Sequence, residues 1–271
     1  MYIESPQNPR IREWSKLKTK KGRQLNGAFL VEGIRLTDEL LRSSLTVDAL
    51  VWDVGTDELP QALLDAAANR GVPFIEVSPQ AFAQLADTVT PQGVIAIAKL
   101  PDALMESNGA PLLRYAVLLD GVQDPGNVGT LLRSADAFGI SAVCAGSGTA
   151  DPFSPKVVRA SMGGLFRVQV QDSDSVKFVQ SWKSLWPDGQ VVVATADAAT
   201  DCYRADLTKP TLLVIGGEAF GVSNEVAQLA DIKVRIPMTG MADSLNAAVA
   251  GSVLLYETFR QRQQLSPEAL A

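Results

Sequence analysis

The stretch LLDGVQDPGNVGTLLRSADAFG, residues 118–139, decides the fold of the larger part of this chain. It carries the end of an apolar run, 115–120, through a loop rich in glycine and aspartate into a helical pattern. Parallel α/β sheets bind ligands at the carboxyl ends of their strands, so this loop is a candidate ligand site. Asn127 suits the N-cap of the helix. Arg133 is a lone charge among apolar helix residues, and an ion pair with Asp136 would explain it structurally.

The same alternation of apolar runs and helical patterns continues from this stretch to the C-terminus. Apolar runs occur at 141–146, 166–170, 191–197, 211–218 and 232–238, and helical patterns occur at 176–185 and from about Ser244. Nearly continuous apolar strands that are separated by helices predict a parallel sheet covered on both faces.

A second α/β series precedes it in the first hundred residues. Apolar runs occur at 29–33, 49–54, 73–77 and 94–100, and helical patterns occur at 8–20, 35–43, 62–71 and 81–87. Residues 101–112 lose this periodicity and gather proline, glycine and asparagine, as linkers do. The sequence therefore predicts a smaller α/β domain at 1–100, a linker at 101–112 and a larger parallel-sheet domain at 113–271.

Composition narrows the possible chemistry. The chain has 271 residues, 46% of them hydrophobic and 20% charged, and it contains no histidine. Every mechanism that needs an imidazole base, relay or metal ligand is excluded. The two cysteines, Cys144 and Cys202, lie far apart, so we expect neither a disulfide framework nor a metal site. The N-terminus has no apolar core of a secretory signal and no long apolar run follows, so we expect a soluble, cytoplasmic protein without membrane contact.

Charge is divided unevenly along the chain. Residues 1–35 hold eight basic and three acidic side chains, whereas the remainder holds sixteen basic and twenty-seven acidic ones. Residues 1–35 therefore form a basic head on an otherwise acidic chain. This uneven charge favours contact with a polyanion at one end of the chain. A solvated, charged first helix is the structural alternative.

Two further glycine-containing segments follow apolar strands. LLVIGGEAFGVSNEV, 212–226, ends a strand in two glycines before Glu218, and paired glycines let a ligand approach the main chain closely. No Gly-Lys-Ser/Thr follows, so this is not a phosphate-cradling loop. RIPMTGMADSLNAAVAGSVLLYE, 235–257, leads into the last helix, which Asp243 or Ser244 would cap. The small residues after it permit tight core packing or a subunit contact.

Taken in order, three motifs resemble those of the SpoU-like branch of the SPOUT class, the knotted RNA ribose 2'-O-methyltransferases. They are N-x-G-x-x-x-R at 127–133, IGGEAFG at 215–221 and IPMTGMADSLN at 236–246. The resemblance covers most of residues 113–262 and implies a deep trefoil knot in the parallel-sheet domain. An ordinary dinucleotide-binding fold would need a glycine fingerprint straight after the first strand, which DGVQDPGNVG does not supply.

The resemblance also implies a cofactor and residue roles. The cofactor is S-adenosylmethionine, bent within the knot and held largely by main-chain groups. Its contacts fall on Thr195, Ala196, Ile215, Gly216, Gly217, Ile236, Met238 and Leu245. Catalytic positions fall on Asn127, Arg133, Glu218, Ser244 and Asn246. Many members read Ser-Leu-Asn-Val-Ser in the third motif, whereas Ala247 and Ala248 follow Asn246 here, which puts any role of the second serine in doubt.

Methyl transfer from a sulfonium needs mainly alignment of the ribose oxygen with the methyl carbon. Arginine stays protonated in proteins, so we interpret Arg133 as a cation that holds phosphate and stabilises developing alkoxide charge, while the proton leaves to phosphate or water. We further expect Glu218 to approach Arg133, so that an arginine fork bridges carboxylate and RNA.

The front of the chain resembles the ribosomal-protein-like substrate-binding domain that many members carry. The matching segments are NPRIREWSKLKTKKGR at 8–23 and FLVEGIRLTDELL at 29–41. The predicted RNA contacts are Arg10, Arg12, Lys16, Lys18, Lys20, Lys21 and Arg23. Such a domain favours ribosomal RNA over transfer RNA. A transfer RNA methyltransferase and an inactive RNA-binding protein of the same fold remain as alternatives.

The family resemblance implies a homodimer formed mainly by the C-terminal domain. The small residues from Ala247 to Ser252, followed by Val253, Leu254 and Leu255, form a plausible packing stripe, although packing within the knot could also use them.

Overall fold

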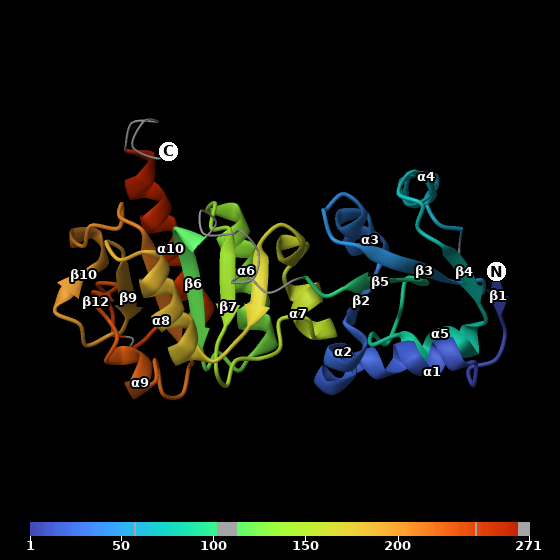
Figure 1. The fold of residues 1–271 in the computed structure, drawn as a ribbon, viewed down its shortest axis with the longest axis horizontal. Coiled ribbons are helices and arrows are strands. Elements are labelled where there is room, and N and C mark those ends of the chain that lie inside the picture. Colours follow the sequence, from blue (N-terminus) through green and yellow to red (C-terminus); the bar gives the residue numbers. More distant parts are fainter. Residues whose placement is uncertain (57, 102–112, 242, 265–271) are drawn as a thin grey trace. The chain divides into compact units, whose positions relative to one another are not determined.

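The computed structural model describes residues 1–56, 58–101, 113–241 and 243–264. They form two compact units, shown in Figure 1. The first comprises Met1–Pro101 together with Phe153–Arg167, and the second contains the other described residues. Apart from Pro101, the predicted linker lies outside the described residues. Among the described helices, none combines the length and apolarity that a membrane span requires.

The first unit is built on a mixed five-stranded sheet with the order β1-β4-β3-β5-β2. Its strands are β1 (Tyr2–Ile3), β2 (Ala28–Glu32), β3 (Val47–Asp53), β4 (Phe74–Val77) and β5 (Val94–Lys99). Its helices are α1 (Pro9–Ser15), η1 (Lys16–Lys18), α2 (Lys20–Asn26), α3 (Ile34–Leu41), α4 (Gln61–Asn69), α5 (Pro79–Leu85), α7 (Pro155–Ala160) and η3 (Gly164–Phe166). Strand β5 runs antiparallel to β2 and β3, whereas β3 and β1 run parallel to β4.

The basic helix predicted at 8–20 is interrupted. Thr19 is extended, with φ −104° and ψ 147°, and its side chain accepts a hydrogen bond from the Gly22 N–H. Helix α2 therefore restarts at Lys20 instead of continuing α1. The apolar face is still as predicted, because Ile11 and Leu17 are buried in the core of the unit.

Residues 153–167, which the sequence assigns to the larger domain, pack with the first unit. Arg159 forms an ion pair with Asp87 at 2.8 Å, and Arg167 forms one with Glu39 at 2.6 Å. The helical elements α7 and η3 occupy most of this segment, so the strand predicted at 166–170 begins only at Gln169. The first unit is therefore not contiguous in sequence.

The second unit contains a seven-stranded sheet with the order β10-β12-β9-β11-β6-β7-β8. Its strands are β6 (Tyr115–Asp120), β7 (Ala142–Ala145), β8 (Gln169–Asp172), β9 (Gln190–Ala194), β10 (Thr200–Asp201), β11 (Thr211–Gly216) and β12 (Ile232–Arg235). Its helices are α6 (Pro125–Ala137), α8 (Ser175–Leu185), η4 (Cys202–Arg204), α9 (Asn224–Ala227) and α10 (Ala247–Gln263). All six strand pairings are parallel, which confirms the predicted parallel α/β fold.

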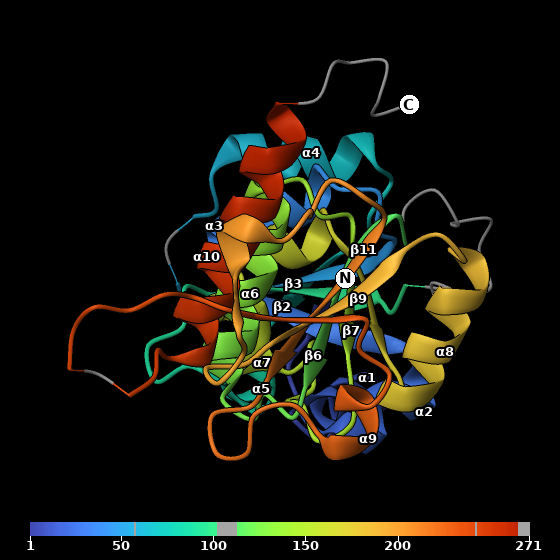
Figure 2. The same cartoon turned by 90° about the vertical axis from the view of Figure 1, so that its left-hand side faces the viewer.

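Helices cover both faces of this sheet. Phe178 and Trp182 of α8 share a core cluster with Leu118 of β6. On the other face, Gly251 of α10 lies against Leu131 of α6. Figure 2 shows α8 and α9 on one side of the strands and α6 and α10 on the other.

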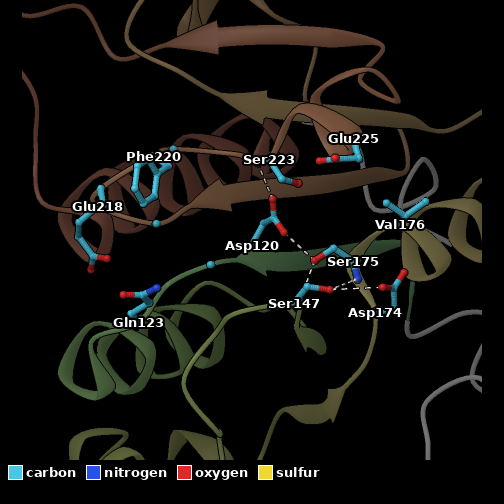
Figure 3. A pocket seen from close by; sticks show the side chains of 14 residues that line it. Asp120, Gln123, Ser147, Asp174, Ser175, Val176, Glu218, Phe220, Ser223 and Glu225 are labelled. Atoms are coloured by element: carbon cyan, nitrogen blue, oxygen red, sulfur yellow. Dashed lines mark hydrogen bonds between the residues drawn. The ribbon is translucent and has the colours of Figure 1, made fainter.

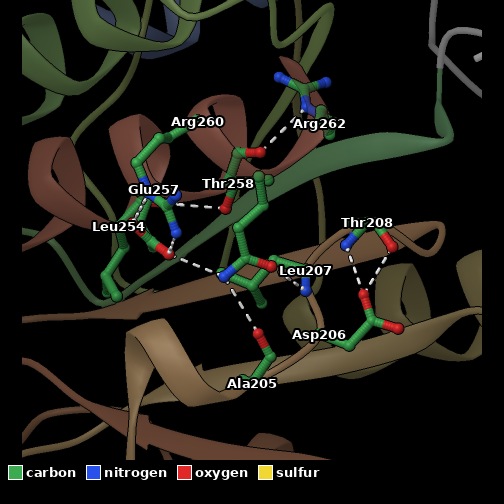
Figure 4. Close-up of polar contacts among 10 residues, drawn as sticks. Ala205, Asp206, Leu207, Thr208, Leu254, Glu257, Thr258, Arg260 and Arg262 are labelled. Atoms are coloured by element: carbon green, nitrogen blue, oxygen red, sulfur yellow. Dashed lines mark hydrogen bonds and ion pairs between the residues drawn. The ribbon is translucent and has the colours of Figure 1, made fainter. Parts of the chain in front are cut away.

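The second half of α10 is anchored by buried polar contacts, shown in Figure 4. Gln261 accepts a hydrogen bond from the Leu207 N–H at 2.9 Å and donates to the Ala205 carbonyl at 3.1 Å. The Arg260 guanidinium donates to Glu257 and holds the pKa of that carboxyl below its ordinary value. The two Gln261 contacts tie the second half of α10 to the loop that precedes β11.

Candidate functional site

The first turn of α6 places Asn127 at the carboxyl edge of the sheet. Strand β6 ends at Asp120, and the Asp124 carboxylate caps α6 by accepting from the Asn127 N–H at 2.9 Å. Pro125 takes the first helical position, where its missing N–H costs nothing. The prediction that Asn127 caps the helix is therefore wrong, and its side chain remains available for other contacts.

Three predicted site residues from three different motifs form one hydrogen-bonded chain. The Asn127 amide donates to the Glu218 carboxylate, and the Asn246 amide donates to the Asn127 carbonyl oxygen at 3.1 Å. The Asn246 carbonyl oxygen accepts from the N–H groups of Ala248 and Val249 at 2.9 and 3.2 Å. Both amide groups are thereby oriented, and the Glu218 carboxylate is held by a neutral donor.

Asn246 is also the N-cap of α10. The last helix therefore begins at Ala247, later than the predicted start near Ser244, and neither Asp243 nor Ser244 caps it. Ser244 is exposed and lines the pocket described below.

The fold of the chain itself requires the paired glycines, which also line the pocket described below. A Cβ on Gly216 would lie 2.2 Å from the Gly221 carbonyl carbon, and one on Gly217 would lie 2.0 Å from the Gly121 oxygen. Gly217 also donates to the Asp120 carbonyl at 2.9 Å. The chain itself, folding back over the ends of β11 and β6, occupies the space that two missing side chains provide.

A pocket of about 290 Å³ opens beside this glycine segment, at the ends of β9, β11 and β12. All eight residues predicted to contact the cofactor line it: Thr195, Ala196, Ile215, Gly216, Gly217, Ile236, Met238 and Leu245. Glu218 and Ser244 line it as well. The Thr195 hydroxyl donates to Asp197 and holds the pKa of that carboxyl below its ordinary value.

Sequence reasoning missed Arg235, the one basic side chain among the described residues that line this pocket. Its Nε donates to Asp201 at 2.9 Å, and this contact lowers the pKa of the Asp201 carboxyl. Its position in the sequence could have identified it, because Arg235 directly precedes the third motif.

Arg133 stands apart from the chain of amides. It is exposed and has no hydrogen-bond or ion-pair partner among the described residues. Neither the expected approach to Glu218 nor the alternative pair with Asp136 is formed. Arg133 follows Asn127 by six residues, about one and two-thirds helical turns, so the two side chains leave α6 in different directions.

The basic head is only partly available to a ligand. Arg23 is 3% exposed and donates to the Leu17 carbonyl at 2.7 Å, so its predicted role as a phosphate contact is wrong. Lys18 is half-buried and donates to the Ala86 carbonyl at 2.6 Å. The other predicted contacts are exposed: Arg10, Arg12, Lys16, Lys20 and Lys21.

The apolar stripe predicted for a dimer contact also needs correction. Leu254 and Leu255 are each 1% exposed because they face the core of their own unit. Val249, Val253 and Tyr256 form the exposed apolar face of α10 instead.

Cys144 and Cys202 are both buried free thiols, and burial raises the pKa of each.

Fold and site together define an α/β protein that binds a small ligand at the carboxyl edge of a parallel sheet. The model of the SpoU rRNA methylase family matches residues 114–256, and that of the MRM3-like substrate-binding domain matches residues 8–96. The chain belongs to the SpoU methylase family.

Relatives align over nearly the whole chain. The 23S rRNA (guanosine(2553)-2'-O)-methyltransferase RlmP of Bacillus subtilis is 33% identical, with 94% of this chain and 97% of that protein aligned. The 23S rRNA (uridine(2479)-2'-O)-methyltransferase of Streptomyces viridochromogenes is also 33% identical, over 94% and 91%. The crystal structure of the SpoU methyltransferase AviRb from Streptomyces viridochromogenes with AdoMet has a TM-score of 0.84 and 31% identity, covering 96% of this chain and 100% of that one.

Proposed function

We propose that this protein transfers a methyl group from S-adenosylmethionine to a ribose 2'-hydroxyl of ribosomal RNA. One observation carries the proposal: the pocket that contains all eight expected cofactor residues also contains Glu218, which Asn127 and Asn246 orient. The relatives named above support the same reaction and the same class of RNA, and AviRb was crystallised with this cofactor.

The pocket fits the proposed cofactor chemically. Ile215, Ile236 and Leu245 offer apolar contacts for a flat base, and the strand-end main chain offers hydrogen-bonding groups for its edge. Glu218 and Arg235 give the pocket one negative and one positive side chain, suited to the sulfonium and carboxylate of the methionine part. The knot that the family implies would form the frame of this pocket. When bound, the cofactor supplies an activated methyl group.

The residues of the chain then position the ribose. The Asn127 amide holds the Glu218 carboxylate at the pocket edge, where a negative charge favours a cationic methyl donor. Arg133 binds RNA phosphate and stabilises charge on the attacking oxygen, and its exposed guanidinium is available for this. Guanidinium stays protonated, so phosphate or water takes the hydroxyl proton.

The test is incubation of the full chain with labelled S-adenosylmethionine and total RNA from a strain that lacks the enzyme. We expect label in ribosomal RNA at one nucleotide, detected by its resistance to alkaline cleavage. Label in transfer RNA alone would favour the alternative substrate. Cofactor binding by calorimetry separates an enzyme from an inactive RNA-binding protein, because the latter would bind RNA but no cofactor.

The proposal also includes a homodimeric assembly and a cellular location. The exposed apolar face of α10, formed by Val249, Val253 and Tyr256, is suited to a homodimer contact through the C-terminal unit. Light scattering at micromolar protein should then report a dimer, and a monomer would contradict it. We also propose a cytoplasmic location, which the bacterial ribosomal RNA methyltransferases among the relatives support.

A further inference from the structure

Arg235 lies where the two outermost strands at one end of the second sheet reach the proposed cofactor pocket. It is the last residue of β12, and its register partner is Asp201, the last residue of β10. Figure 1 shows β10 and β12 side by side at this end of the sheet. Register partners present their side chains on the same face, so the strand pairing brings the guanidinium and the carboxylate together.

The contact between these two side chains uses only part of the guanidinium. The Arg235 Nε donates to one carboxylate oxygen of Asp201 at 2.9 Å, and the Tyr203 hydroxyl donates to the other oxygen at 3.0 Å. Because Tyr203 holds the second oxygen, the arginine and the carboxylate do not form a two-pronged pair. The terminal nitrogens of Arg235 make no hydrogen bond to any of the described residues. Their N–H groups can therefore donate to a ligand.

Asp201 is suited to hold Arg235 in one orientation. The Asp201 side chain is 12% exposed, whereas that of Arg235 is 44% exposed. Hydrogen bonds from Arg235 and Tyr203 lower the pKa of the Asp201 carboxyl, which keeps it ionised. A charged acceptor with little exposure to water thus fixes the Nε of a guanidinium that borders the pocket.

The charges around the pocket direct an anionic ligand group toward Arg235. A second hollow shares Gly217, Glu218 and Gly221 with the pocket, and Figure 3 shows the acidic side chains around it. The residues described as its lining include no lysine or arginine. A carboxylate is repelled from that side, whereas Arg235 is the one basic side chain among the described residues of the pocket.

We propose that Arg235 binds the α-carboxylate of S-adenosylmethionine through its terminal nitrogens and that Asp201 is the positioning residue that orients Arg235. Asp201 acts through Arg235, because it is not among the described residues that line the pocket. The inference rests on the proposed methyltransferase function and adds the residues that recognise the amino-acid part of the cofactor. The structural alternative is an ion pair that only fastens β10 to β12.

Calorimetry with two ligands distinguishes these interpretations. S-adenosylhomocysteine carries the α-carboxylate, whereas 5'-methylthioadenosine has the same nucleoside and sulfur without it. Arg235→Gln should weaken binding of S-adenosylhomocysteine about tenfold or more, the range for losing hydrogen bonds between charged groups. The affinity for 5'-methylthioadenosine should stay as in the wild type, because that ligand has no group for the guanidinium to bind.

A double-mutant cycle tests whether Asp201 acts through Arg235. Asp201→Ala should weaken binding of S-adenosylhomocysteine about threefold or more in the wild-type background. In the Arg235→Gln background, the same change should have no further effect on this affinity. Asp201→Asn, which removes the charge but keeps the shape, provides a milder variant with the same expected pattern. Thermal unfolding of each variant measures stability separately.

Arg204→Gln is the matched control. Arg204 also lies near the Asp201 carboxylate, at 3.8 Å, but it is not among the described residues of the pocket, so this variant should bind both ligands as the wild type does. Equal losses for the two ligands, or wild-type affinity for S-adenosylhomocysteine in the Arg235 or Asp201 variants, would overturn this proposal. Failure of the wild type to bind S-adenosylhomocysteine would contradict the proposed function instead.

Discussion

Asn246 performs two tasks with one amide group. Its carbonyl oxygen caps α10, and its NH₂ group donates to Asn127, which in turn holds Glu218. Aspartate is an equally good N-cap but has no donor, so the two tasks are separable.

We expect Asn246→Asp to retain the stability of the wild type within about 0.5 kcal/mol, whereas Asn246→Ala should lose about 1 kcal/mol. Both variants should lose methyl transfer about tenfold or more, because the amide donor to Asn127 is gone. Urea unfolding and single-turnover methylation measure the two effects. Full activity in Asn246→Asp would show that the amide chain does not orient the site.

Arg133 falls on a motif position but has no hydrogen-bond or ion-pair partner among the described residues. We expect Arg133→Lys to keep the fold and cofactor affinity while turnover falls about a hundredfold, because lysine retains the charge but loses the two-pronged guanidinium. Single-turnover rates at saturating RNA and cofactor measure this. A nearly normal rate would reduce Arg133 to a surface residue of α6.

At the scale of elements, the segment that connects β11 to α9 depends on close main-chain contact. Gly217 makes a ladder contact with Gly221 and lies against Gly121, so the segment has no room for a side chain there. Replacing Gly216 with valine would disturb this packing directly and would not report on the cofactor alone.

We expect Gly217→Ala to destabilise the protein by about 1–3 kcal/mol, as overpacking does, and to weaken cofactor binding. Gly240→Ala is the control, because no atom lies within 4 Å of the Cβ it would add. That variant should stay within about 1 kcal/mol of the wild type, on the stabilising side. Equal unfolding midpoints for the two variants would contradict the close approach.

On the scale of the whole molecule, the acidic and basic parts of the chain separate into different regions. The exposed cations of the first unit follow from the basic head, whereas acidic side chains gather around the end of β6 in the second unit: Asp120, Asp174, Glu218 and Glu225. We therefore expect the phosphate contacts of an RNA substrate in the first unit and at Arg133.

Neutralising Lys16, Lys20 and Lys21 with glutamine should weaken RNA binding and reduce the slope of log affinity against log salt. Arg23→Gln should leave that slope unchanged and lower stability instead, since Arg23 is buried against the Leu17 carbonyl. Filter binding across a salt series, with unfolding curves for both variants, makes the comparison. An unchanged slope in the lysine variant would identify the head as a merely solvated surface.

The amino-acid sequence by itself determined the fold class, and its family resemblance indicated eight of the residues that line the pocket. Apolar runs such as 115–120 and 211–216 became parallel strands, because burial on both faces demands continuous apolar side chains. The three motifs lie at strand ends, and parallel strands bring their carboxyl ends to one edge. All eight expected cofactor residues consequently line one pocket.

Only the tertiary structure decided which side chains of these motifs meet. Asn127 joins Glu218 and Asn246, which lie 91 and 119 residues away, while Arg133 on the same helix joins neither. Arg23 and the segment 153–167 likewise changed their expected roles through contacts with distant parts of the chain. Local pattern favours burial or exposure at a position, but the packing of distant strand ends and helix termini decides which hydrogen-bond partner a side chain meets.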